Sequence, residues 1–193
     1  MKKSKYTLPP VLVVILLIAY YLITSSGNKN LTSTPPSSQS TAGAPAAVSN
    51  GPHTWGKQTK TSGCLASNGL QDSACTPGDV METDTSKICQ KGYAGGVRNV
   101  PESEKNQVYA EYNITSRTSG QYEVDHLVSL ELGGSNDISN LWPELASPKP
   151  GFHEKDRVEN YLHDQVCSGK MTLQDAQIQI ATNWLAVYNQ MQK

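Results

Sequence analysis

An aspartate and a histidine stand side by side at Asp125 and His126, and an asparagine follows at Asn140. Histidine changes its protonation state near neutral pH, so its imidazole can take up a proton during a reaction. The same pair could instead be a hydrogen-bonded structural pair in an inactive domain. The elements that position these residues therefore decide what the three can do.

A short strand is predicted to carry the Asp-His pair. The alternating pattern of residues 122–126 places Tyr122, Val124 and His126 on one face. Neighbouring residues of a regular strand point to opposite faces. A bend or bulge is therefore expected to bring Asp125 and His126 to one site.

A turn, a second strand and a helix are predicted to follow. Residues 133–137 read Gly-Gly-Ser-Asn-Asp, which is typical of a turn. The second strand is predicted to return through residues 140–142 and to end at Pro143. Residues 152–167 have the pattern of an amphipathic helix.

This order of strand, loop, strand and helix, with Asp-His on the first strand and Asn at the second, resembles the HNH endonuclease motif of the ββα-metal nucleases. The resemblance is specific over Val124–Glu144 and looser over the helix, and the motif core spans residues 121–168. It implies an α+β fold for residues 53–193, with additional helices and a disulfide-tied N-terminal part.

The resemblance also implies roles for single residues. His126 is the general base, and Asn140 fixes the loop so that the base is oriented. Asp125 is a metal ligand, and His153 at the start of the helix is the second one. The usual Cys-x-x-Cys-His ending is absent from this chain, so other ligands stay open. These competitors of His153 are Glu144, Asp156, Glu159 and His163.

The resemblance implies a metal-dependent endonuclease that hydrolyses phosphodiester bonds in nucleic acid. DNA is expected in preference to RNA. Mg²⁺ is the expected ion, with Mn²⁺ or Zn²⁺ as alternatives. Activity is expected to fall below about pH 6, as His126 becomes protonated. The alternative is a catalytically inactive binding module on the same fold, for a cell-surface polymer or a partner protein. A protein inhibitor is a further partner that the sequence leaves unknown.

The charges of the domain bear on this choice. Residues 53–193 contain 12 lysines and arginines against 17 aspartates and glutamates, a formal charge of −5. A nucleic-acid binder usually carries a basic surplus, so the acidic balance favours the binding module. Arg98, Lys105 and Arg117 are the cations that could face phosphate, although solvated surface charge is the default for such residues.

The N-terminal part is predicted to take the domain out of the cytoplasm. Three lysines precede an uncharged apolar run from Leu8 to Ile23, which is typical of a signal anchor or transmembrane segment over residues 1–24. A cleaved signal peptide is the alternative. Residues 25–52 are rich in Ser, Thr and Pro and predict a flexible linker. The domain is then anchored to the membrane by its N-terminal helix, or secreted.

Four cysteines in an exported chain predict two disulfides. Cys64–Cys75 would pin a loop that has little core of its own, and Cys89–Cys167 would tie the early part of the domain to the helix end. These are the favoured pairs among the alternatives. Zinc ligation is a competing use of the cysteines, but no Cys-x-x-Cys spacing is present.

Overall fold

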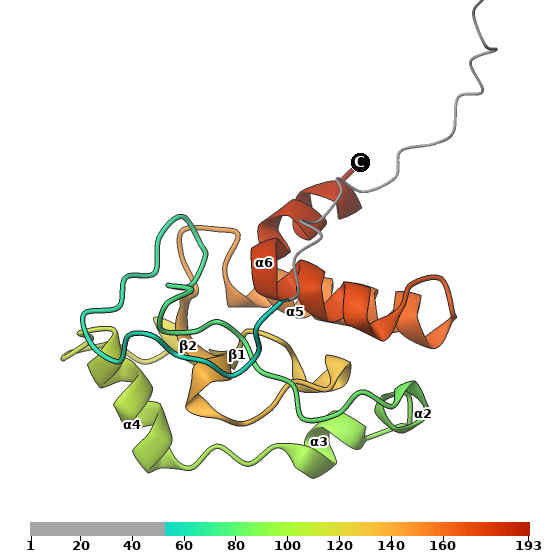
Figure 1. The fold of residues 1–193 in the computed structure, drawn as a ribbon. Coiled ribbons are helices and arrows are strands. Elements are labelled where there is room, and N and C mark those ends of the chain that lie inside the picture. The colour runs from blue at the N-terminus through green and yellow to red at the C-terminus, as the bar shows by residue number, and fades with distance from the viewer. Residues whose placement is uncertain (1–52) are drawn as a thin grey trace, which may run out of the picture. The chain divides into compact units, whose positions relative to one another are not determined.

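Two antiparallel strands and the helix after them form the centre of the computed structural model, which describes residues 53–193 (Figure 1). β1 spans Tyr122–His126, β2 spans Leu141–Leu145 and α5 spans Phe152–Cys167. The other elements are α2 (Thr85–Ile88), α3 (Tyr93–Val97), α4 (Glu102–Glu111), α6 (Leu173–Met191) and the short 3-10 helices η1 (Leu130–Leu132) and η2 (Ile138–Asn140). The described residues therefore have the mixed α+β architecture that the sequence predicts, with one two-stranded sheet.

The predicted N-terminal anchor (1–24) and linker (25–52) lie outside the described residues. Within residues 53–193, no helix is both long and apolar enough to cross a membrane.

β1 and β2 pair in a regular antiparallel register. Asp125 stands opposite Trp142, and His126 stands opposite Leu141. The register runs through both pairs without an inserted residue, so the bend or bulge expected at this strand end is wrong. Because neighbours in a regular strand alternate, the side chains of Asp125 and His126 leave β1 on opposite faces.

The prediction that Pro143 ends the second strand is also wrong. Pro143 lies in the middle of β2, opposite Val124. Both strands of a two-stranded sheet are edge strands, and a proline without an N–H group is tolerated on an edge.

Two glycines let the chain between the strands fold back tightly. Gly133 has a positive φ of 78°, and a side chain on it would collide with the carbonyl of Glu82. The backbone of Gly134 lies so close to the carbonyl of Val128 that a side chain would not fit there either. This tight path brings Asn136 back to His126 at the end of β1.

Helices α5 and α6 contribute a large part of the apolar core. Val158, Leu162 and Val166 on α5 are buried at helical spacing. Thr172 caps α6, because its hydroxyl accepts the N–H of Asp175 at 3.1 Å. A kink at Asn183 interrupts α6, and the helix continues beyond it to Met191.

The part before β1 consists of loops, three short or medium helices and two disulfides. Cys64 is bonded to Cys75, and Cys89 to Cys167, which are the two favoured pairs. Residues 89–92 form turns between α2 and α3. The second disulfide joins the end of α2 to the end of α5.

Removal of the second disulfide is predicted to destabilise the domain strongly. The bond links residues 78 positions apart, and closing a loop of that length removes about 4 kcal/mol of chain entropy from the unfolded state. We expect Cys89→Ala/Cys167→Ala to lose an unfolding free energy of that order in urea titrations. A loss below about 1 kcal/mol, measured with the other disulfide intact, would show that the bond does not constrain the fold.

Candidate functional site

The loop between the strands is fixed by Asn140, which is fully buried. Its side-chain oxygen accepts the N–H of Val128 at 2.9 Å and that of Asp79 at 3.2 Å. Its amide nitrogen donates to the carbonyls of Val128 at 3.0 Å and Ser135 at 2.8 Å. The side chain thus acts as a clamp on the loop, and a direct part of Asn140 in catalysis stays a prediction.

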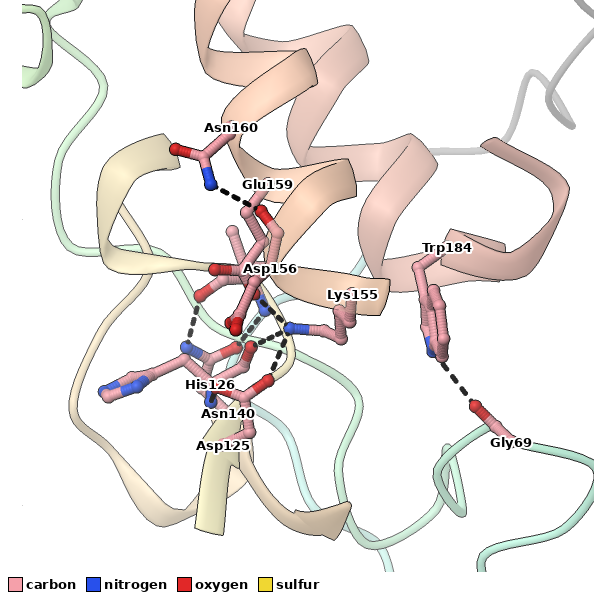
Figure 2. A network of polar contacts seen from close by, with 10 residues as sticks. Gly69, Asp125, His126, Asn140, Lys155, Asp156, Glu159, Asn160 and Trp184 are labelled. Atoms are coloured by element: carbon pink, nitrogen blue, oxygen red, sulfur yellow. Dashed lines mark hydrogen bonds and ion pairs between the residues drawn. The ribbon is translucent and has the colours of Figure 1, made fainter. Parts of the chain in front are cut away.

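On one face of β1, the carboxylate of Asp125 meets a buried lysine of α5. The ammonium of Lys155, whose side chain is 0% exposed, donates to Asp125 Oδ2 at 2.7 Å and to the backbone carbonyl of His126 at 2.8 Å (Figure 2). It also forms an ion pair with Glu159, one turn further along the helix. The other oxygen of Asp125 accepts the backbone N–H of His126 at 2.8 Å. We call Lys155, Asp125 and Glu159 the lysine network.

The lysine network shifts the protonation of its members in opposite directions. Burial alone would lower the pKa of Lys155, but the Asp125 and Glu159 carboxylates hold that pKa above its usual value. Burial alone would raise the pKa of Asp125, and Lys155 nevertheless holds it below its usual value. Burial raises the pKa of Glu159 above its usual value, and Lys155 acts in the opposite direction. An ionised Asp125–Lys155 pair therefore persists at neutral pH.

Glu144 on β2 extends this buried polar region. Its two carboxylate oxygens are buried and have no hydrogen-bond partner within the described residues. Burial raises the pKa of Glu144 to about 10, so this carboxyl is protonated at neutral pH. A neutral Glu144 avoids adding a further negative charge beside Asp125.

On the other face of β1, the imidazole of His126 is held by Asn136. His126 is 2% exposed, and its Nε2 lies 3.2 Å from the side-chain oxygen of Asn136. That oxygen also accepts the N–H of Asn99 at 3.0 Å, while the Asn136 amide nitrogen donates to the carbonyl of Val97 at 2.9 Å. These contacts fix the amide orientation, so Nε2 of His126 carries the proton and Nδ1 keeps its lone pair.

The imidazole is neutral at physiological pH. Burial lowers the pKa of His126 to about 4, although Asp125 and Asn136 act in the opposite direction. In Figure 2 the ring points away from the ammonium of Lys155. The carboxylate and the imidazole of the Asp-His pair therefore belong to two separate networks on the two faces of β1.

The His126 side of the sheet borders a pocket of about 480 Å³. Three cations from different segments line it: Arg98 after α3, Lys105 on α4 and Arg117 before β1. They lie far apart in the sequence, and the fold brings them to the pocket that His126 lines. Glu102 and Glu123 also line this pocket, so the positive charge is partly offset. We call it the basic pocket.

Within the described residues, the one group of three or more metal-ligand side chains does not include Asp125 or His153. His153 is exposed and its ring packs against Phe152, with ring centroids 4.3 Å apart. Both oxygens of Asp125 are already engaged, one of them by the ammonium of Lys155. Asp125 and His153 therefore do not fit a divalent ion in this arrangement, and the predicted ion stays a prediction. Among the competing ligands, Glu159 approaches Asp125 through Lys155.

A second group of ligand-type residues lies elsewhere. Cys89, His163 and Cys167 have their potential ligand atoms within 4.8 Å of one another. His163 Nε2 lies 3.2 Å from the carbonyl of Ile88 and 3.4 Å from the sulfur of Cys167. Because the two cysteines form a disulfide, their sulfurs are not the thiolates that bind zinc. His163 is thus placed beside the disulfide instead of in the lysine network.

Two residues central to this geometry were missed by the sequence analysis. Lys155 falls on the same helical stripe as Val158 and Leu162, so a charged residue in an apolar stripe was the available signal. Asn136 lies in a Gly-Ser-Asn-Asp run that looks like ordinary turn chemistry. No sequence pattern distinguished it from a turn residue.

Comparison with protein-family models, curated proteins and solved structures finds no match to this chain. The candidate site is therefore defined by its own residues and geometry.

The lysine network is predicted to hold α5 against β1. In Lys155→Met the charge of Asp125 stays buried without its partner, and removing one partner of a buried ion pair typically costs about 3–5 kcal/mol. We expect a loss of unfolding free energy of that size in urea titrations followed by circular dichroism. Adding Asp125→Asn to this variant should restore part of the loss, because the unpaired charge is then gone.

The matched control for this prediction is Lys149→Met. Lys149 is exposed and forms an ion pair with the largely buried Glu154 at 3.0 Å, and a pair whose cation stays in solvent contributes at most about 1 kcal/mol. Equal losses in Lys149→Met and Lys155→Met would contradict a structural role of the lysine network.

Proposed function

We propose that residues 53–193 form an endonuclease domain that hydrolyses phosphodiester bonds in nucleic acid, with DNA as the first substrate to test. The observation that carries this proposal is a neutral imidazole, that of His126, at the wall of a pocket lined by Arg98, Lys105 and Arg117. A general base and cations for phosphate are the two groups that such a hydrolysis needs. The two disulfides are compatible with an extracytoplasmic location, either anchored or secreted.

In the proposed reaction, the cations of the basic pocket hold the scissile phosphate and offset the charge that develops on it. His126 takes a proton at Nδ1, the nitrogen that Asn136 leaves free, from the attacking water as the water oxygen bonds to phosphorus. The P–O bond to the departing sugar oxygen breaks, and this oxygen takes up a proton from solvent. The side-chain oxygen of Asn136 stabilises the imidazolium through Nε2–H. Lys155 acts from the opposite face of β1, where it fixes the strand end that carries His126.

The test of the proposal is a cleavage assay on plasmid and on single-stranded DNA, with and without His126→Gln. A positioned general base contributes about 10²–10⁴-fold to the rate. We expect the variant to lose activity by that factor and to keep the wild-type fold. Its urea unfolding midpoint should change no more than in an ordinary single substitution. The assay is run with EDTA and with added Mg²⁺ or Mn²⁺, since the predicted ligands do not assemble into an ion site.

Two results would contradict the proposal. Wild-type rates in a folded His126→Gln variant would remove His126 as the base. Absence of cleavage by the wild type under every ionic condition would favour the binding module. His153→Gln serves as a separate arm: a changed Mg²⁺ requirement in this variant would restore His153 as a metal ligand.

The pH dependence of cleavage is predicted to differ from that of an ordinary histidine. His126 accepts a proton only when it is neutral, and burial lowers its pKa to about 4. The active form is therefore present above that pH and is lost as pH falls through it. The loss near pH 6 expected from an unperturbed histidine is thus replaced by a loss about two units lower. Half-loss of kcat/KM near pH 6.5, with the fold intact, would contradict a buried neutral base.

A further inference from the structure

We propose that the basic pocket takes single-stranded nucleic acid in preference to an intact duplex. This inference rests on the proposed function and concerns the substrate of the same site. It follows from the depth of His126, from the small number of unpaired cations and from the aromatic wall of the pocket.

His126 is recessed. It is almost completely buried, and it lines the wall of the pocket. A phosphate must therefore enter the pocket to meet the imidazole. The backbone of a single strand can bend into a pocket of about 480 Å³, whereas the phosphates of a stiff duplex follow the outside of a wide cylinder. The depth of the base thus selects for a flexible strand.

The charges of the pocket fit a few phosphates only. Lys105 has a carboxylate partner, Glu102, at 4.0 Å. Arg98 and Arg117 form no ion pair with a carboxylate within the described residues, so they are the cations left for phosphate. The formal charge of −5 over residues 53–193 repels the remaining phosphates of a duplex.

An aromatic wall adds a surface on which a base could stack. The guanidinium of Arg117 lies 3.8 Å from the centroid of the Tyr109 ring. Tyr122 packs edge-on against Tyr109, with ring centroids 6.4 Å apart. Tyr109 is buried beneath this guanidinium, whereas Arg117 is exposed, so the outer face of Arg117 is the surface that a base can reach. Planar guanidinium groups stack unpaired bases, which are accessible only in a single strand.

The experiment measures binding of a fluorescent DNA 12-mer and of the duplex with the same sequence to full-length His126→Gln by fluorescence anisotropy. We expect at least tenfold tighter binding of the single strand. The slope of log K against log salt should be about −0.7 to −1.4, which corresponds to one or two phosphates on a single strand. Wild-type protein with phosphorothioate-linked DNA repeats the measurement if the variant does not fold.

Arg117→Gln should weaken single-strand binding several-fold. Arg157→Gln, which removes an equal charge from α5 beside the Tyr188 ring outside the basic pocket, should leave it unchanged. Equal or tighter binding of the duplex, or equal effects of the two substitutions, would overturn the single-strand inference. Cleavage by the wild type in that case would leave the proposed function standing, whereas absence of both binding and cleavage would overturn the two together.

Discussion

The buried ammonium of Lys155 is the interaction on which the candidate site depends. It contacts the carboxylate of Asp125, the backbone carbonyl of His126 and the carboxylate of Glu159 with no exposure to solvent. An unpaired charge in this position would be costly, so the helix, the strand end and the two carboxylates must come together as one unit. The lysine thereby determines where β1 ends relative to α5.

Because of this constraint, the two faces of β1 differ in charge, in access to solvent and in role. The Asp125 face is closed and charged, and it holds the strand to the helix. The His126 face opens to the basic pocket, where an imidazole without a charge can accept a proton. An Asp-His pair on a regular strand need not act as one constellation, because the pleat itself separates the two side chains.

The sequence predicts the elements well where local patterns determine them. The alternating residues of β1 and the amphipathic pattern of α5 lead to the observed elements. The contents of the site are harder to predict, because they depend on contacts between distant segments. Lys155 is a charged residue in an apolar stripe with no evident partner until Asp125 is placed against it, and Asn136 looks like a turn residue until the loop returns to His126. The pocket cations come from three segments that only the fold brings together.

The central claim is that His126 stands at the pocket wall as a neutral base with its proton on Nε2. It is tested most directly by NMR of the imidazole nitrogens in ¹⁵N-histidine-labelled protein through a pH titration. The geometry predicts an Nε2–H tautomer at pH 7 and a midpoint near pH 4. A proton on Nδ1, or a ring already charged at pH 6, would contradict it.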